Sequence, residues 1–127
     1  MALIKGVHHV CMKCTSSDRF DAVCKFYGET LGLTKVREWP AGVMYDLGGS
    51  LLEVFSNGTE DLPQGVWQHI ALATEDVDGC VKAVRDAGYA ITVEPKDIVI
   101  ASEPPVPARI AFCIGPNGEE IEFFCEK

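Results

Sequence analysis

Two histidines and two glutamates occupy matching places in the two halves of this 127-residue sequence. His9 and Glu53 belong to the first half, and His69 and Glu122 belong to the second. Each glutamate sits inside an apolar segment, LLEVF or EIEFF, where a carboxylate is costly to bury unless it is paired or bound to a metal. One such residue alone reads most simply as a core or solvent-facing position, but four in matching places argue against coincidence.

The chemistry that this quartet could perform is metal binding. Two imidazoles and two carboxylates form a mixed nitrogen and oxygen ligand set, which suits Zn²⁺, Ni²⁺, Co²⁺, Fe²⁺ or Mn²⁺ better than Ca²⁺. Four protein ligands around a six-coordinate ion leave two positions for water or for substrate oxygens. The residues therefore predict an open, catalytic type of metal centre.

The first histidine lies in the stretch GVHHVCMKC, which also contains a C-x-x-C pattern. Because side chains alternate along a strand, Cys11 and Lys13 share the face of His9, whereas His8 and Cys14 point to the other face. A metal knuckle or redox pair needs a turn to bring two such sulfurs together. We therefore expect both cysteines to be structural.

Other residues are weaker candidates for binding a substrate. Alternation places Phe55 and Asn57 on the face of Glu53, and it places Trp67 on the face of His69. Either aromatic ring could line a pocket or pack in the core. An anionic substrate could be bound by one of four basic residues, each of which could equally be a solvated surface charge: Lys13, Arg37, Lys96 and Arg109.

The elements that must position these residues occur twice, in the order strand, helix and three strands. In the first half, a strand over 7–14 precedes a helix that ends near Leu31, where Gly32 is a plausible stop. In the second half, Asp76 can cap a helix that ends at Gly88. The remaining strands are expected at 34–39, 42–47 and 50–56, then at 66–74, 90–94, 107–114 and 119–125.

The repeat predicts an α+β fold of two tandem βαβββ modules, residues 1–58 and 65–127, within one domain over 1–127. The spacing from histidine to glutamate differs between the halves, and we assign the difference to a proline-rich loop over 94–109. Sheets of this size leave faces and edges that a second module, or a second chain, can cover.

Composition excludes several classes of partner. The formal net charge is −8, without a basic run, which argues against nucleic acid and against anionic membranes. The sequence has no stretch of about 18 apolar residues and no signal-peptide pattern at its start, so we expect a cytoplasmic protein with reduced cysteines.

Several motifs together resemble the vicinal oxygen chelate superfamily, and within it glyoxalase I (lactoylglutathione lyase). They are HVCMKC, FYGETLGL, LLEVFSNG, HIALATEDVD and GPNGEEIEFF, and they cover nearly the whole chain. The resemblance implies that His9, Glu53, His69 and Glu122 hold one divalent ion per site, with Zn²⁺ or Ni²⁺ favoured and Co²⁺, Mn²⁺ or Fe²⁺ as alternatives. It further implies a homodimer whose sites combine residues of two chains, although assembly within one chain stays open.

The implied reaction detoxifies methylglyoxal. A hemithioacetal of a 2-oxoaldehyde and a thiol becomes a 2-hydroxyacyl thioester through a metal-bound enediolate, with Glu122 as the main base and Glu53 assisting. Asn57 matches a family asparagine that binds the glutathione end of the substrate. Lys13 stands where bacterial relatives commonly carry an arginine, and lysine lacks the bidentate fork of arginine.

Three alternative functions fit the same fold. An acyl-CoA epimerase would use the same ion and bases, but it usually has glutamine at the position of Glu53. An extradiol-type dioxygenase has one carboxylate ligand fewer. A non-catalytic protein that sequesters a drug or a metabolite needs no metal, and the intact quartet counts against it.

Overall fold

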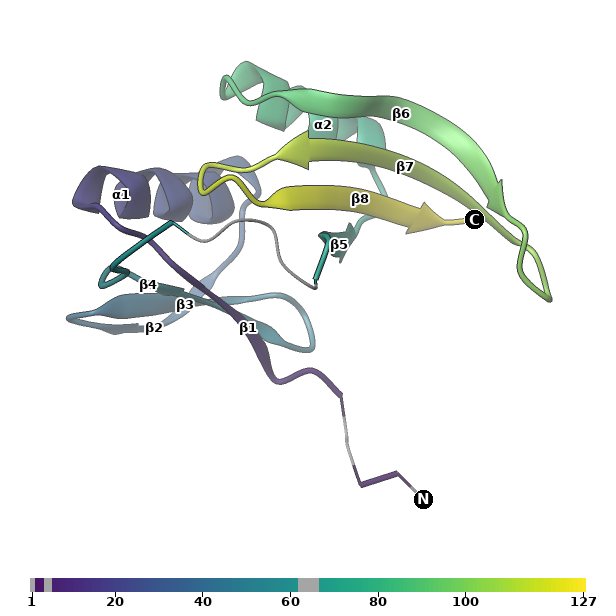
Figure 1. Ribbon diagram of the computed structural model, residues 1–127. Helices are drawn as coiled ribbons and strands as arrows, with labels where there is room; N and C mark the ends of the chain where they lie inside the picture. The colour runs from purple at the N-terminus through teal and green to yellow at the C-terminus, as the bar shows by residue number, and fades with distance from the viewer. Residues whose placement is uncertain (1, 4–5, 62–66) are drawn as a thin grey trace. The chain divides into compact units, whose positions relative to one another are not determined.

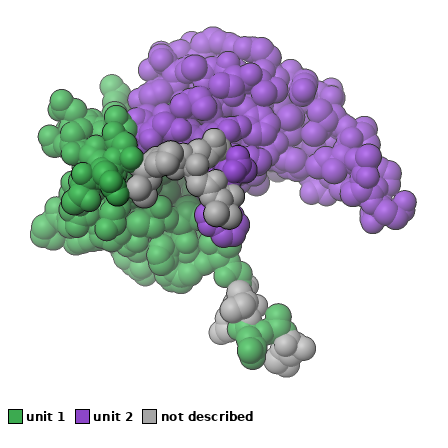
Figure 2. Space-filling model, viewed as in Figure 1, with its two compact units in different colours: residues 1–61 green, residues 62–127 purple. Residues whose placement is uncertain are grey.

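The computed structural model describes residues 2–3, 6–61 and 67–127, and these form two compact units, Met1–Asp61 and Leu62–Lys127 (Figure 2). Both units have the predicted order of strand, helix and three strands (Figure 1). The two-module α+β fold predicted from the sequence is therefore confirmed. Within the described residues, no helix is long and apolar enough to cross a membrane.

Unit 1 consists of a helix and a four-stranded sheet with the order β1-β4-β3-β2. Strand β1 runs parallel to β4, and the other neighbours are antiparallel. The elements are β1 (His9–Lys13), α1 (Ser17–Lys25), a π-helical turn η1 (Phe26–Thr30), β2 (Lys35–Trp39), β3 (Gly42–Asp46) and β4 (Leu51–Phe55).

The first helix has a capped start, and the helical segment ends where the sequence predicts. The side chain of Ser16 accepts a hydrogen bond from the backbone N–H of Arg19, which satisfies an otherwise unpaired donor at the helix start. After η1 the chain turns at Gly32, whose φ of +75° is a conformation that glycine adopts without strain. The predicted stop at this glycine is confirmed.

The core of unit 1 lies between α1 and one face of the sheet. Val23 and Phe26 are buried on the helix side, and Val54 is buried on β4. The hydroxyl of Tyr45 on β3 donates to the carbonyl of Cys24 at 3.2 Å, which fixes this face of the sheet against the helix. Each fully buried side chain of this kind contributes about 1.5–3 kcal/mol to stability. The opposite face of the sheet is the one that carries Glu53.

Unit 2 repeats this plan with the strand order β5-β8-β7-β6, in which only β5 and β8 are parallel. Val81 and Val84 of the helix are buried, as are Ile121 and Phe123 of β8. Its elements are β5 (Ile70–Ala73), α2 (Val77–Asp86), β6 (Ile91–Ile100), β7 (Val106–Ile114) and β8 (Glu120–Glu126). Asp76 caps α2 by accepting from the backbone N–H of Gly79 at 2.9 Å, as predicted.

One sequence prediction in unit 2 is wrong. The stretch 94–109, expected to be a loop, belongs largely to a long hairpin of β6 and β7 that continues past the end of β8 (Figure 1). Ile98 pairs with Ala108, and Ile100 pairs with Val106. The β-branched run IVI favours a strand, and Pro95 is tolerated because β6 is an edge strand.

Candidate functional site

The first histidine–glutamate pair lies on the open face of the unit 1 sheet. His9 begins β1 and Glu53 is at the centre of β4, its parallel neighbour. The Nε2 atom of His9 is 3.6 Å from the Oε1 atom of Glu53. The side chain of Glu53 is only 14% exposed, whereas that of His9 is 42% exposed. A sheltered carboxylate thus faces an imidazole that solvent can reach.

The second pair is built in the same way in unit 2. His69 directly precedes β5, and Glu122 lies on β8, the parallel neighbour of β5. Their Nε2 and Oε1 atoms are 3.1 Å apart, and the side chains are 37% and 12% exposed. Phe112 of β7 packs edge-to-face against the ring of His69, with centroids 5.3 Å apart. The structure thus brings together the two residues that the repeat singled out in this half.

Each pair fits a divalent ion in its donor chemistry and in its spacing. Two neighbouring ligands at about 2.0–2.2 Å from an ion, roughly at right angles, stand about 3 Å apart. The 3.1 Å and 3.6 Å separations are close to that value. Across residues 2–3, 6–61 and 67–127, no three or more His, Cys, Asp or Glu side chains form a single cluster that could hold an ion. One pair therefore supplies two ligands, which is half of the predicted set.

His8 makes a contact that sequence reasoning missed. Its Nδ1 atom is 3.0 Å from the Nδ1 atom of His9, and the two rings meet edge-to-face with centroids 5.2 Å apart. Because His8 precedes the first residue of β1, strict strand alternation does not hold its ring on the opposite face. The contact engages one nitrogen of His9 and leaves the other directed at Glu53, as partners of metal-binding histidines do. The adjacent histidines were the only sequence signal for it.

Cys11 and Lys13 were predicted to share the face of His9, and the strand register places Glu53 on that face as well. Cys11 is the register partner of Glu53, and burial together with the negative charge of Glu53 raises the pKa of its thiol. The Nζ atom of Lys13 lies 5.4 Å from the ring centroid of Phe55, within the range of a cation–π contact. Cys14 is fully buried, so the two cysteines of the C-x-x-C pattern have different environments.

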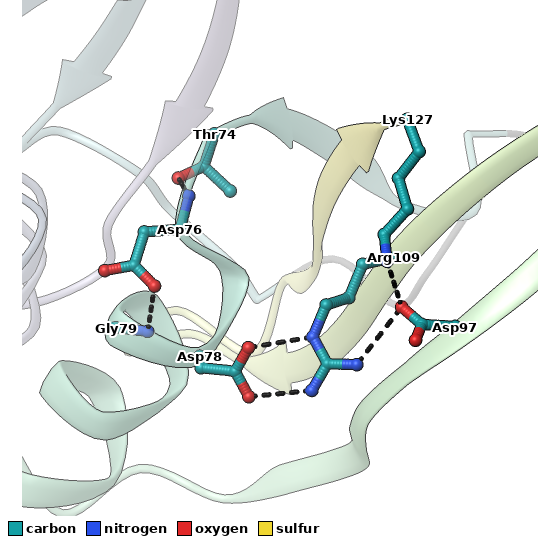
Figure 3. A network of polar contacts seen from close by, with 7 residues as sticks. All are labelled: Thr74, Asp76, Asp78, Gly79, Asp97, Arg109 and Lys127. Atoms are coloured by element: carbon teal, nitrogen blue, oxygen red, sulfur yellow. Dashed lines mark hydrogen bonds and ion pairs between the residues drawn. The ribbon is translucent and has the colours of Figure 1, made fainter.

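The other candidates have varied surroundings. Asn57 is exposed, two residues beyond the end of β4. Trp67 is 90% exposed, so the suggestion that it packs in the core is wrong. Arg109 forms ion pairs with Asp78 on α2 and with Asp97 on β6 (Figure 3). Its guanidinium is therefore occupied within the protein.

Two open hollows, one in each unit, are lined by residues outside the histidine–glutamate pairs. One of about 500 Å³ lies beside the β2–β3 hairpin and is lined by Phe20, Glu38, Trp39, Pro40, Gly42 and Val43. The other, of about 320 Å³, lies in unit 2 and is lined by Asp78, Val81, Lys82, Arg85, Glu94, Pro95 and Arg109. Neither includes a residue of the quartet, so the site is defined by its ligand atoms and not by a cavity.

Two βαβββ units in tandem, each with a four-stranded mixed sheet, form the fold of the vicinal oxygen chelate class of proteins. Residues 6–123 match the Glyoxalase/Bleomycin resistance protein/Dioxygenase superfamily. The chain belongs to this superfamily, in which a divalent metal ion is typical and which contains both enzymes and non-catalytic members. A comparison with curated proteins gives no match.

Solved structures support the same fold. A glyoxalase/dioxygenase from Nostoc punctiforme is 20% identical with a TM-score of 0.73, over 97% of this chain and 92% of that one. A glyoxalase family protein from Bacillus anthracis is 18% identical with a TM-score of 0.72, over 100% and 99%. A glyoxalase/bleomycin resistance protein/dioxygenase from Alicyclobacillus acidocaldarius is 17% identical with a TM-score of 0.69, over 96% and 92%. At these identities the likeness extends to the fold alone.

Proposed function

We propose that this protein is a metal-dependent lyase of the glyoxalase type. It converts the hemithioacetal of a 2-oxoaldehyde and a thiol into a 2-hydroxyacyl thioester. The observation that supports this is the duplicated contact between a histidine nitrogen and a sheltered glutamate oxygen, at 3.6 Å in unit 1 and 3.1 Å in unit 2. A protein that only sequesters a ligand has no need for two such pairs.

In this proposal the two pairs together supply the ligands of one divalent ion, with Zn²⁺ or Ni²⁺ favoured and Co²⁺, Mn²⁺ or Fe²⁺ possible on the same donor set. When bound, the ion supplies positive charge that stabilises negative charge on the substrate oxygens. The protein is a homodimer, and the pairs that meet come from one chain or from two.

The glutamates move the proton. The reaction takes a proton from one carbon and returns it to the neighbouring carbon, which requires a carboxylate within hydrogen-bond reach of both. Glu122 is the more buried of the two, at 9% exposed for the whole residue, so its carboxylate is the better shielded from bulk water. We therefore assign the main base to Glu122, with Glu53 as its assistant. Lys13 and Asn57 bind the part of the substrate beyond the reacting carbons.

The test is reconstitution. The full chain is stripped with a chelator and assayed with methylglyoxal and glutathione, with and without added Ni²⁺ or Zn²⁺, for formation of the S-lactoyl thioester. We expect activity only with metal, and we expect Glu122→Gln to reduce kcat by at least about a hundredfold. The control Glu120→Gln changes a nearby carboxylate of the same strand and should retain activity.

The contrary outcomes are distinct. Inactivity with every common metal and thiol, although the protein binds metal, overturns the lyase reaction. Solvent deuterium entering an acyl-CoA would instead identify an epimerase. Tight binding of a ligand that Glu122→Gln leaves unchanged, without turnover, would identify a sequestering protein.

A further inference from the structure

The face of the unit 1 sheet that carries Glu53 also carries a basic and aromatic surface, which we call the Glu53 face. Its residues follow from the strand registers. One row across the four strands contains Cys11, Glu53, Met44 and Arg37, and the adjacent row contains Lys13, Phe55, Gly42 and Trp39. These two rows lie within a single unit, next to the first histidine–glutamate pair.

An irregularity in β2 is what places Arg37 on this face. The register between β2 and β3 shifts between Lys35 and Arg37. If the pairing of Lys35 with Tyr45 continued without the shift, Arg37 would lie opposite Val43, which is buried on the α1 side. The shift instead puts Arg37 opposite Met44 and Trp39 opposite Gly42. Bulges of this kind commonly re-aim a side chain beside a functional site.

Arg37 differs from every other arginine of the chain. Arg19, Arg85 and Arg109 each form an ion pair with a carboxylate. Within the part of the chain that the structure describes, the guanidinium of Arg37 donates to the sulfur of Met44 at 3.5 Å and has no carboxylate partner. A thioether is a weak acceptor, so most of the donor capacity of this guanidinium is available to an external anion.

The adjacent row supplies a flat apolar surface. The rings of Trp39 and Phe55 meet edge-to-face with centroids 5.6 Å apart. Gly42 permits this arrangement, because a Cβ atom there would stand 2.8 Å from the Cζ2 atom of Trp39. Lys13 lies on the other side of Phe55. Each ring thus has a basic neighbour: Lys13 on β1 is next to Phe55, and Arg37 lies two residues before Trp39 on β2.

We propose that Arg37 is a specificity-determining residue that binds the carboxylate of a planar, apolar anion seated against Trp39 and Phe55. Within the proposed reaction, the substrate class is therefore a hemithioacetal whose aldehyde-derived or thiol-derived part carries a flat, apolar carboxylate. Arg37 and Glu53 are two strands apart, about 10 Å between backbones, so the carboxylate lies within reach of a small substrate whose reacting carbons are at Glu53. The assignment of these residues to substrate contacts rests on the proposed function. Binding of an aromatic carboxylate at Arg37 can nevertheless be tested without metal.

The experiment titrates the full chain with benzoate, with its neutral isostere benzamide and with acetate, and follows the two indole N–H signals by NMR. The variant Trp67→Phe assigns the signals, since the chain has two tryptophans. We expect benzoate to shift the Trp39 signal and to bind at least about tenfold more tightly than benzamide or acetate. Arg37→Gln should weaken benzoate by a similar factor, and Arg37→Lys by less. The matched control Arg19→Gln, which removes an arginine that pairs with Asp61, should change nothing.

Equal binding of benzoate and benzamide would overturn the proposal, as would equal binding by Arg37→Gln and the wild type. Loss of benzoate binding in Phe20→Ala, but not in Arg37→Gln, would place the ligand in the hollow beside α1 and overturn it as well. Metal titration separates this inference from the proposed function. We expect Arg37→Gln to lose benzoate binding but keep metal binding, and His9→Ala to lose metal binding but keep benzoate binding. The two sites are then independent, so the inference about Arg37 and the proposed function can be refuted separately.

Discussion

At the scale of single residues, the contact between His8 and His9 sets the orientation of the His9 imidazole. His9 can direct Nε2 toward Glu53 while Nδ1 is held 3.0 Å from His8. Gln68 stands at the corresponding place before His69, so the second half has an amide where the first has an imidazole. A partner on the far nitrogen orients a metal-binding histidine and typically changes metal affinity by about 10–100-fold.

We therefore predict that His8→Phe, which keeps a ring but removes both nitrogens, weakens Zn²⁺ or Ni²⁺ binding by about tenfold or more in a calorimetric titration. His8→Gln copies the other half of the repeat and should stay near the wild type. If both variants bind metal as the wild type does, the contact has no part in orienting His9. If both weaken binding equally, the imidazole is needed for another reason.

At the scale of elements, α2 is tied to the β6–β7 hairpin by a small ionic network (Figure 3). The Nε and Nη2 atoms of Arg109 donate to the two carboxylate oxygens of Asp78, each at 2.8 Å, and Nη1 donates to Asp97 at 3.2 Å. Lys127 also pairs with Asp97 at 2.9 Å. Hydrogen bonding to Arg109 lowers the pKa of Asp78, and hydrogen bonding to Lys127 and Arg109 lowers the pKa of Asp97.

The direction of the pH effect follows from these lowered pKa values. Each aspartate stabilises the fold fully above its unfolded pKa, about 3.9, and this contribution is lost as the pH falls through the lower folded value. We predict that the midpoint of thermal unfolding falls on acidification below about pH 5, and that Arg109→Gln makes this fall shallower. The control Arg85→Gln also removes one positive charge, but Arg85 lies on α2 and pairs with neither Asp78 nor Asp97. An unchanged acid slope in Arg109→Gln would contradict the prediction.

The sequence predicted the helices and most strands more completely than it predicted how the strands pair. Helical spacing, the cap at Asp76 and the stop at Gly32 are local signals, so they predicted α1 and α2 correctly. The shift that re-aims Arg37 depends on cross-strand pairing, which no local pattern encodes. The hairpin over 94–109 was mistaken for a loop because its prolines outweighed its β-branched residues. The contact of His8 depends on where β1 begins, which sequence places only to within a few residues.

At the scale of the whole molecule, the repeat divides the proposed ligand set into two halves that fold in different units. Each half repeats a two-ligand module, and no cluster of three or more possible ligands occurs among the described residues. In the proposed function each half supplies two of the four ligands, so metal binding requires both halves. Loss of either histidine should therefore remove most of the metal-dependent rise in thermal stability.

Complementation between variants tests whether the halves come from one chain or two. His9→Ala and His69→Ala should each bind metal poorly, and mixing them after reversible dissociation is informative. If sites combine two chains of a dimer, about half of the dimers are mixed and each of these has one complete site. Metal binding then recovers to about a quarter of the wild-type amount. Mixing His9→Ala with Glu53→Ala, two changes in the same half, is the control that should never recover. No recovery in the first mixture means that each site forms within one chain, whereas full metal binding by either single variant would show that the two pairs do not share an ion.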